Sequence, residues 1–251
     1  MTSLASSNLR LKNHVENAAH QLQQDHGGDD PRAVITAALD AFGERFAIVS
    51  SFGAESAVLL HQASEVSKDI PILFLDTGKL FGETRRYRDQ LQKLLGLTNV
   101  QTIKPDSSQI AAEDPKGSLW QKDHNRCCFI RKVIPFKLSL DGFDAWASGR
   151  KRFQTHTRAT IDHFEYTDGR TTVNPLALWS SDDIRTYIDR HNLPRHRLIA
   201  DGFKSIGCMP CTDRVVDNED ERSGRWRNKD TTECGIHLTN AQNQSLTSSA
   251  L

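Results

Sequence analysis

The sequence lacks a net charge and a long hydrophobic run. Its 251 residues include 32 basic and 32 acidic side chains, so no overall field draws the chain to nucleic acid or to an anionic membrane. The longest apolar run, IPILFL, falls far short of the roughly 20 residues that cross a bilayer. The N-terminal stretch MTSLASSNLRLKNH has no apolar segment of the kind that a signal peptide needs. We therefore expect a cytoplasmic protein that binds neither nucleic acid nor a membrane.

Cysteine is scarce, and its placement needs an explanation. Cys127 and Cys128 are adjacent in NRCCFIRK, Cys208 and Cys211 form a C-x-x-C, and Cys234 stands alone. A reducing cytoplasm makes disulfides a poor explanation. Structural zinc prefers two C-x-x-C knuckles or histidines, and adjacent cysteines on a helix project about 100° apart. From spacing alone, an iron–sulfur cluster on the four paired cysteines ranks first, zinc second and buried unligated thiols last.

Hydrophobic periodicity predicts an α/β fold with a mainly parallel sheet flanked by helices. Apolar runs predict strands over residues 46–50, 70–75, 99–104 and 143–147, and a hairpin over residues 164–173. Helical spacing predicts helices over residues 9–26, 31–42, 81–95 and 127–140. A further helix is expected to begin at Ser180 or Ser181, and Pro135 is expected to kink or break the helix over 127–140.

Two strand ends carry loops that suit an anionic ligand. After the first strand, SSFGAESAVLLH changes to helical spacing, which points free N–H groups and the positive end of a helix at the loop. The candidate ligand residues of this loop are Ser51, Phe52, Gly53 and Ser56. After the second strand, the ligand position of an open α/β sheet falls on LDTG, that is on Leu75, Asp76, Thr77 and Gly78. A capping role for Asp76 in the next helix is about as well supported.

A third loop, SGRKRFQTHTRA, follows the strand over 143–147 and is strongly basic. The planar fork of arginine suits phosphate and sulfate oxygens, so this loop favours an anion site over a merely solvated surface. The candidate residues are Gly149, Arg150, Arg152, Gln154 and Arg158. Which of the three cations at positions 150–152 contacts the ligand stays open.

Cys234, in ECGIHL, has the sequence surroundings of a nucleophile. Arg222 and Arg225 precede it and can lower the pKa of its thiol, which makes thiolate available near neutral pH. Gly235 lets the backbone approach a ligand closely, and His237 can hold an anionic oxygen or steer a leaving group. A polar C-terminal segment of this kind can also open and close over a site as a lid.

Four motifs together resemble a known family. NRCCFIRK, IGCMPC, SGRW and ECGIHL occur in the order found in thioredoxin-dependent assimilatory adenylyl-sulfate (APS) reductases, within the wider phosphosulfate reductase family. The match runs from about Phe46 to Leu238. The resemblance implies a position between cluster and substrate for Lys132. It implies one [4Fe–4S] cluster, held by Cys127, Cys128, Cys208 and Cys211.

The resemblance also implies a mechanism. Cys234 would attack the sulfur of APS, displace AMP and carry the sulfonate, while Arg222, Arg225 and His237 neutralise the substrate oxygens. With four cysteines on a cluster, no second thiol is left to resolve this intermediate. Thioredoxin, or a glutaredoxin-like reductant, is therefore the expected partner, and sulfite for cysteine biosynthesis is the expected product. The cluster is expected to play a structural and electrostatic part.

The loop at Ser51 resembles the PP-loop of adenine-nucleotide α-hydrolase-like proteins, which implies that fold with a C-terminal lid segment. Ala54 and Glu55 stand where ATP-splitting members carry Lys-Asp, which fits a nucleotide that is bound without pyrophosphate release. We divide the chain into an N-terminal helical segment, a nucleotide-binding core, a cluster-binding and catalytic segment of the same domain, and a disordered tail. Their bounds are 1–43, 44–203, 204–238 and 239–251.

Three alternative functions stay open. Reduction of 3′-phosphoadenylyl sulfate (PAPS), alone or beside APS, differs by one phosphate, and the four cluster-type cysteines favour APS. A zinc-stabilised nucleotide-binding regulator would use the same site without turnover. A tRNA-thiolating enzyme shares the PP-loop, but the missing Lys-Asp pair, the ECGIHL motif and the zero net charge count against it. The sequence leaves the oligomeric state open, and a homo-oligomer is compatible with it.

Overall fold

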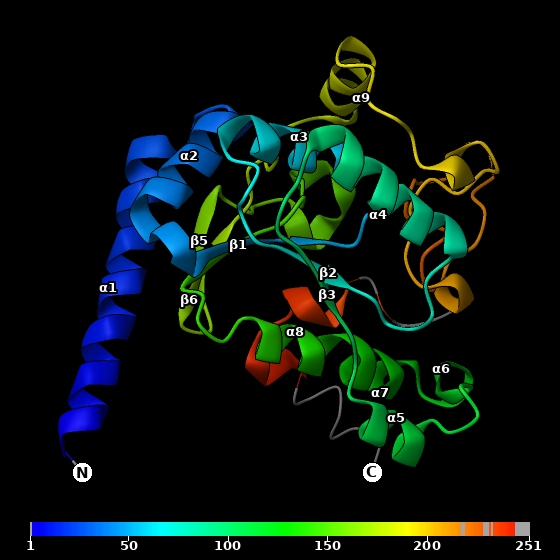
Figure 1. Cartoon of the computed structure of the whole chain (residues 1–251), viewed down its shortest axis with the longest axis horizontal. Coiled ribbons are helices and arrows are strands. Elements are labelled where there is room, and N and C mark those ends of the chain that lie inside the picture. The colour runs from blue at the N-terminus through cyan, green and yellow to red at the C-terminus, as the bar shows by residue number, and fades with distance from the viewer. Residues whose placement is uncertain (1, 217–218, 228–230, 232, 244–251) are drawn as a thin grey trace.

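The computed structural model describes residues 2–216, 219–227, 231 and 233–243, with side chains from residue 13 onward (Figure 1). Within this part of the chain, every helix is too short or too polar to span a membrane. Most of the tail that we expected to be disordered, 239–251, lies outside the described residues. The described part of the tail includes Asn243, which is buried and donates hydrogen bonds to the carbonyls of Gly235 and Leu238.

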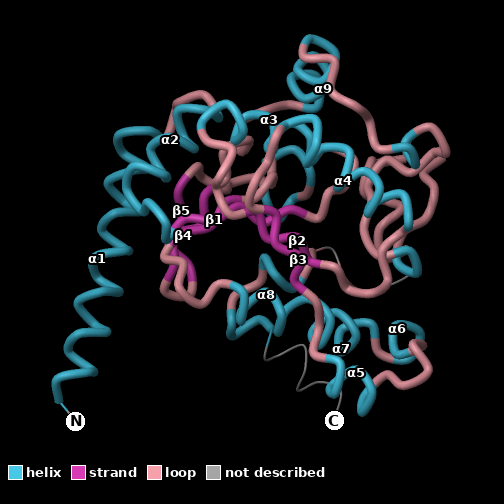
Figure 2. The backbone as a smooth tube through the Cα atoms, viewed as in Figure 1, coloured by secondary structure: helices cyan, strands magenta, loops and turns pink. Residues whose placement is uncertain are grey.

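A six-stranded sheet forms the middle layer (Figure 2). Its strands are β1 (Phe46–Ser50), β2 (Ile72–Leu75), β3 (Val100–Ile103), β4 (Ala145–Ala147), β5 (Phe164–Thr167) and β6 (Arg170–Val173). Their order across the sheet is β3-β2-β1-β4-β6-β5, and every neighbouring pair is parallel except the hairpin β5–β6. Asp168 and Gly169 turn that hairpin with positive φ angles of 53° and 85°, as a two-residue loop requires. The expected mainly parallel α/β sheet is thereby confirmed.

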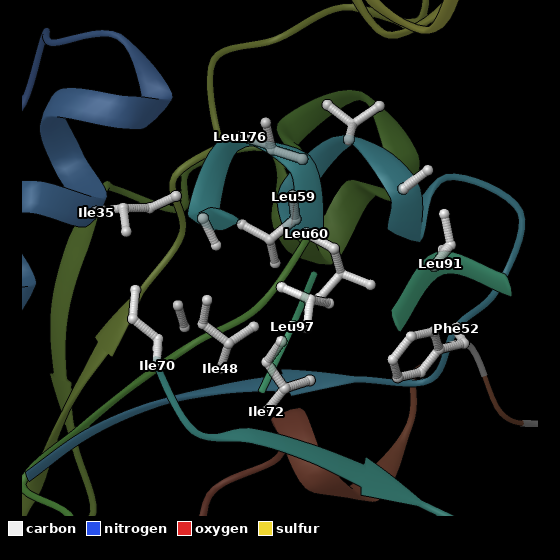
Figure 3. Close-up of a cluster of buried hydrophobic side chains, with 14 of the residues drawn as sticks. Ile35, Ile48, Phe52, Leu59, Leu60, Ile70, Ile72, Leu91, Leu97 and Leu176 are labelled. Carbon is white, nitrogen blue, oxygen red and sulfur yellow. The ribbon is translucent and has the colours of Figure 1, made fainter. Parts of the chain in front are cut away.

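Helices cover both faces of the sheet (Figure 1). One side carries α2 (Pro31–Phe42), α3 (Ser56–Val66), α4 (Gly82–Leu95) and α9 (Ser181–Arg190). The opposite side carries α5 (Ser107–Glu113), α6 (Leu119–Lys122), α7 (His124–Cys128) and α8 (Ile134–Ser139). Residues of β1 alternate between these two sides because side chains of a strand point to opposite faces in turn. Ile48 joins the larger core under α3, shown in Figure 3, and Val49 joins a smaller core with Phe136 and Trp146.

The helix expected over 127–140 is continuous but not regular. A π-helical turn, Phe129–Val133, joins α7 to α8 directly before Pro135. Proline lacks an N–H and crowds the preceding turn, and a widened turn relieves that conflict without ending the helix. The expected kink at Pro135 therefore takes the form of a π turn, and its immediate effect is on the direction of the side chains around Cys128.

The helix α1 (Thr2–His26) packs beside the β5–β6 hairpin at one edge of the sheet (Figure 1). Among the residues of α1 whose burial is described, Val15 and Ala19 are buried. The Gln23 side-chain oxygen accepts the backbone N–H of Phe164 at 2.9 Å, where β5 begins. This bond satisfies a backbone donor at the start of an edge strand, a position that a sheet otherwise leaves unpaired.

Candidate active site

A cavity of about 320 Å³ lies at the carboxyl ends of β1 and β4. The chain runs from β1 outward through β2 and β3 and then returns to place β4 on the other side of β1. Open α/β sheets bind ligands at such a reversal of strand order. Ser50 and Ser51 reach the cavity after β1, and Ser148 and Gly149 reach it after β4.

Thirteen of the eighteen residues predicted to bind substrate or to act in catalysis line this cavity. They are Ser51, Gly53, Ser56, Leu75, Lys132, Gly149, Arg150, Gln154, Arg158, Arg222, Arg225, Cys234 and His237. They come from every loop that we singled out, so the fold brings together segments more than a hundred residues apart in the sequence.

Phe52 is the one predicted residue of the first loop that turns away from the cavity. It is fully buried and packs edge-to-face on Phe74, with ring centroids 5.2 Å apart. Its φ of 48° lies in the left-handed region, which is uncommon for a residue with a bulky side chain. Gly53 follows, and a Cβ there would lie 3.1 Å from the carbonyl oxygen of Ile206, so glycine allows this close approach. Phe52 thus anchors the loop in the core and presents its neighbours to the cavity.

The other predicted residues outside the cavity hold nearby structure. The Asp76 carboxylate accepts the backbone N–H of Gly78 at 3.0 Å and pairs with Arg85. It does not cap the next helix, because the N-cap of α4 is Phe81. Arg152 donates to the Ile161 carbonyl and pairs with Asp162. Leu75, the first residue of LDTG, is the one that reaches the cavity.

Thr77 belongs to the same turn but lies against the paired cysteines. Its hydroxyl oxygen is 3.2 Å from the sulfur of Cys208. Gly78 lies beside this turn with a positive φ of 71°. The LDTG turn therefore connects the end of β2 to the cysteine group rather than to the cavity alone.

Sequence reasoning missed a buried ion pair at the cavity. Lys151 is 2% exposed, and its ammonium lies 2.5 Å from a carboxylate oxygen of Glu55, which also accepts a hydrogen bond from Gln154. Burial lowers the pKa of Lys151 although Glu55 acts in the opposite direction. Of the three cations at 150–152, Arg150 and Lys151 line the cavity and Arg152 does not. The pair joins residues 96 apart, and no local pattern marks it.

A second missed pair joins Arg158 to Glu233, the first residue of ECGIHL. Two parallel bonds of 2.6 Å connect the guanidinium with the carboxylate, and both side chains are at most 9% exposed. Burial alone would raise the pKa of Glu233, but the bonds from Arg158 outweigh it and lower that pKa to about 2. The same carboxylate accepts the backbone N–H of Cys234 at 2.8 Å. Arg158 is therefore occupied by a residue of the C-terminal segment.

Three partly buried cations at the cavity have no carboxylate partner among the described residues: Lys132, Arg222 and Arg225. The Arg225 guanidinium lies over the Trp226 ring, 4.4 Å from its centroid. Burial, together with Arg158 and Arg225, lowers the pKa of Arg222 to about 10. Half-buried cations without a counter-ion favour an anionic ligand, because such a ligand offsets their desolvation.

Lys132 lies between two groups of thiols. Burial lowers the pKa of its ammonium, yet the thiolates of Cys208, Cys234 and Cys128 outweigh burial and raise that pKa above its usual range. Cys128 and Cys208 belong to the paired cysteines, whereas Cys234 lines the cavity. The side chain is thus close enough to both groups for their charges to act on its ammonium.

His237 lies deep in the cavity lining. Its ring stacks on Trp146, with centroids 5.8 Å apart and planes 17° from parallel. Burial, followed by the charges of Arg150 and Arg158, lowers its pKa well below the usual range, so the imidazole is neutral at pH 7. Among the described atoms, its Nδ1 has no hydrogen-bond partner. A neutral ring with an unused nitrogen is suited to a hydrogen bond with a ligand and not to an ion pair.

The four paired cysteines lie in two segments that are far apart in the sequence. Cys127 and Cys128 end α7, and Cys208 and Cys211 flank a short 3-10 turn that an antiparallel bridge from Cys208 to Leu80 holds in place. In the described part of the chain, none of the four forms a disulfide. Burial raises the pKa of Cys127 to about 11 and that of Cys128 to about 12. The charge of Arg131 opposes the rise at Cys127, and the charges of Cys208 and Cys211 add to it, so the two cysteine pairs lie within electrostatic range of each other.

This donor set was tested against the two metal groups that the sequence left open. In the described ranges, no three His, Cys, Asp or Glu side chains converge closely enough to hold a single metal ion. A tetrahedral zinc ion with bonds of about 2.3 Å needs its sulfurs nearly in contact. A cluster of four irons accepts four thiolates that stand further apart, and nearby cations offset its negative charge. Four thiols within electrostatic range of one another, beside Arg131 and Lys132, therefore suit a cluster better than a single zinc ion.

Residues 45–214 match the sequence model of the phosphoadenosine phosphosulfate reductase domain. The chain belongs to the phosphoadenosine phosphosulfate reductase family. Among curated members, adenosine 5′-phosphosulfate reductase of Mesorhizobium japonicum is 48% identical over 85% of this chain and 84% of its own length. The protein of the same name from Chelativorans sp. is 45% identical over 89% of this chain and 92% of its own length. Membership of the family, expected from four short motifs, is confirmed.

Solved structures show the fold of the family in this chain. Phosphoadenylyl-sulfate reductase of Candida auris, solved as a phosphate complex, superposes with a TM-score of 0.67 at 23% identity, covering 78% of this chain and 96% of that one. FMN adenylyltransferase of Candida glabrata superposes with a TM-score of 0.51 at 12% identity over 95% and 88% of the two chains. At these identities the likeness concerns the arrangement of sheet and helices, and it bears out the adenine-nucleotide α-hydrolase-like fold.

Proposed function

We propose that this member of the family reduces APS to sulfite and AMP, with Cys234 as the nucleophile and thioredoxin, or a glutaredoxin-like protein, as the electron donor. The observation that carries the proposal is the convergence of Cys234 with three partly buried cations, Lys132, Arg222 and Arg225, in one cavity at the switch point of the sheet. Relatives of 45% and 48% identity over most of their length carry the name of this activity.

The cavity divides into a part for the nucleoside and a part for the anhydride. The loop at Ser51 and Gly53 leads into α3, and its free N–H groups face the ligand position. Val49 and Leu59 supply apolar surface beside it for the adenine ring. The unpaired cations lie toward the C-terminal segment, which assigns the phosphosulfate end to their side of the cavity.

The first chemical step is an attack by the Cys234 thiolate on the sulfur of the bound sulfate. A sulfur–sulfur bond forms while the bond from sulfur to the AMP phosphate oxygen breaks, and AMP leaves with the electron pair. Lys132, Arg222 and Arg225 offset the charge on the transferring and leaving oxygens. The neutral His237 donates a hydrogen bond without adding charge. The enzyme then carries a cysteine S-sulfonate.

The second step needs an external dithiol. A thiolate of the reductant attacks the sulfur of Cys234, sulfite leaves with the electron pair, and a mixed disulfide remains. The second thiol of the reductant resolves it, so two electrons and the regenerated Cys234 balance the reaction. We assign the other four cysteines to the metal group proposed below, which leaves no second thiol of this chain for the role.

We further propose that the paired cysteines would hold one [4Fe–4S] cluster. When bound, the cluster supplies negative charge beside Lys132 and a covalent connection between α7 and the 208–211 turn, and it need not donate electrons. Lys132 then has an anionic partner on one side and orients its remaining donors toward the cavity. We assign the protein to the cytoplasm, a reducing compartment in which thiolate ligands of this kind persist.

The preference for APS over PAPS has support in the cavity itself. Glu55, Asp220 and Glu221 line it, and burial together with Glu55 raises the pKa of Glu221. A 3′-phosphate beside Asp220 and Glu221 would add negative charge to theirs, whereas Lys132, Arg222 and Arg225 serve the phosphosulfate end of the substrate. Dual use of APS and PAPS remains the alternative that the experiment decides.

The test is sulfite release by the anaerobically purified protein with thioredoxin, comparing APS with PAPS at equal concentration. We expect sulfite from APS, little from PAPS, and a loss of at least about 10³-fold in Cys234→Ser. The variant should still bind AMP, which separates loss of the nucleophile from loss of the fold. Equal rates with both nucleotides would indicate dual specificity. Sulfite from neither, with iron and thioredoxin present, contradicts the proposal, and zinc without iron would favour a nucleotide-binding regulator.

A further inference from the structure

The buried pair of Arg158 and Glu233 has a place in the fold that substrate binding does not explain. Arg158 follows the basic loop after β4, and Glu233 belongs to the C-terminal segment 75 residues later. Nine-tenths or more of both side chains is hidden from solvent. Opposite charges in this setting gain much from pairing and lose much when one partner is removed.

Arg158 has little capacity left for a substrate. Its Nε and one terminal nitrogen bind the Glu233 carboxylate at 2.6 Å, and its other terminal nitrogen donates to the Gln154 side-chain oxygen at 2.5 Å. All three nitrogens of the guanidinium are thereby engaged. The neighbouring Arg222 and Arg225 have no such partners in the described part of the chain, so the two kinds of arginine differ in what they can do.

The pair is the end of a polar chain that begins at the nucleotide loop. Lys151 binds Glu55, Glu55 accepts from Gln154, and Gln154 accepts from Arg158. Glu233 completes the chain, and its carboxylate takes the N–H of the next residue, Cys234. A carboxylate held at both oxygens fixes the backbone beside the nucleophile, because it leaves that peptide little freedom to rotate.

We infer that Glu233 is a positioning residue, which docks the C-terminal segment on the core through Arg158 and so places Cys234 over the nucleotide cavity. Arg158 accordingly serves the segment and not the substrate oxygens. The inference deepens the proposed function, since it takes Cys234 as the nucleophile. The Glu233–Arg158 pair holds Cys234 in place before any substrate arrives.

The rival role for the same pair is a placeholder. In that role the carboxylate of Glu233 occupies Arg158 until the anionic substrate displaces it. The two roles predict different results for Glu233→Gln, a variant that keeps the shape of the side chain and removes its charge. A docking residue, once neutralised, releases Cys234, whereas a neutralised placeholder frees Arg158 for the nucleotide.

The experiment measures the alkylation of Cys234 by iodoacetamide in the nucleotide-free holoenzyme, read by mass spectrometry on the peptide that contains it. Glu233→Gln should react at least about tenfold faster than the wild type, because the segment spends more time undocked. Arg158→Lys keeps the charge but loses the second bond, and it should change the rate in the same direction. Glu219→Gln is the matched control, since its carboxylate pairs with Arg227 outside the cavity and its loss should leave the rate unchanged.

Affinity for AMP and steady-state kinetics separate the roles further. If Glu233 docks the segment, Glu233→Gln should lower kcat and keep its affinity for AMP within about threefold of the wild type. The double variant Arg158→Glu with Glu233→Arg, which exchanges the two charges, should recover part of the slow alkylation. If Cys234 of Glu233→Gln is alkylated at the wild-type rate, the inference is overturned. If that variant also binds AMP more tightly than the wild type, Glu233 is a placeholder. Alkylation does not depend on turnover, so these outcomes stand apart from a failure to release sulfite.

Discussion

His196 shows how a single buried side chain links the stability of this protein to pH. It is 1% exposed, and its ring lies 5.0 Å from that of Tyr87 in an edge-on contact. The Leu198 N–H donates to its Nδ1, which leaves the proton on Nε2, 3.1 Å from the Thr84 hydroxyl. A proton added to Nδ1 would displace the Leu198 bond. Burial accordingly lowers the pKa of His196 to about 4.

We predict that His196→Gln weakens the loss of stability in mild acid. Between the folded pKa of about 4 and the unfolded value of about 6.5, the unfolded chain binds more protons at this site, so the free energy of unfolding falls as the pH falls. From pH 7.0 to 5.5 the wild type should lose about 1 kcal/mol more than the variant. Urea unfolding at both pH values measures this difference.

The control for this prediction is His14→Gln, at an exposed position of α1, which should keep the wild-type response. The difference between the two pH values is the readout, so a uniform loss of stability in His196→Gln does not affect the result. Equal pH responses of the variant and the wild type would show that His196 titrates alike in the folded and unfolded chains.

At the same scale, the sequence reveals cations and nucleophiles but not their partners. The basic loop, Arg222, Arg225 and Cys234 could be named in advance, because charge and thiol chemistry are properties of single residues. Glu233 and Lys151 could not, since their pairings join positions 75 and 96 apart. Whether an arginine binds a ligand or a carboxylate depends on the fold, and only the structure separates these two groups.

At the scale of the elements, the sequence offered two serines, Ser180 and Ser181, as the N-cap of α9. Ser180 is the N-cap: its hydroxyl accepts the N–H of Asp183 at 3.2 Å, and the Asp183 carboxylate accepts the N–H of Ser180 at 2.8 Å. Ser181 lies inside the helix, and its hydroxyl accepts a bond from Arg185. The reciprocal bonds satisfy two backbone donors that the first turn would otherwise leave to water.

We predict that Ser180→Ala lowers the free energy of unfolding by about 1 kcal/mol, because it removes this capping box. Ser181→Ala is the matched control and should change stability by less than about 0.5 kcal/mol. Urea titrations of both variants at pH 7 make the comparison. Equal losses in the two variants would show that Ser180 is not the residue that caps α9.

The elements themselves follow from hydrophobic pattern to different degrees. β1 and α2 have the expected bounds, since an apolar run in one case and the caps Asp30 and Gly43 in the other define their ends. The π turn at Phe129–Val133 could not be predicted, because one widened turn barely alters the periodicity of a short helix. Pro135 marks the position of an irregularity in the sequence, but a kink, a break and a widened turn all relieve the same conflict, and the sequence does not choose among them.

For the molecule as a whole, the paired cysteines join two distant parts of the chain. Cys127 and Cys128 belong to the helices beneath the sheet, and Cys208 and Cys211 belong to the segment that leads to Cys234. A group bound to all four would tie these parts together and limit the motion of the segment. Metal content therefore reports on the architecture as well as on the chemistry.

We predict that Cys208→Ser loses most of its iron and most of its sulfite release, whereas Cys234→Ser keeps full iron and loses only the latter. The reason is that the first change removes one of four thiolate ligands and the second leaves all four in place. Iron and acid-labile sulfide, measured on anaerobically purified protein, provide the readout. Full iron and full activity in Cys208→Ser would disprove the assignment of the four cysteines.

The bond between Gln23 and Phe164 joins residues 141 positions apart, and this distance has a consequence for synthesis. A ribosome makes α1 first, but the hairpin against which α1 packs emerges only after most of the chain has been translated. In the nascent chain, Val15 and Ala19 therefore lack the strands that later lie beside them until the hairpin has been made. Contacts of such long separation fold slowly, so the domain cannot complete itself piece by piece from its N-terminus. Its first helix is one of the last parts to find its place.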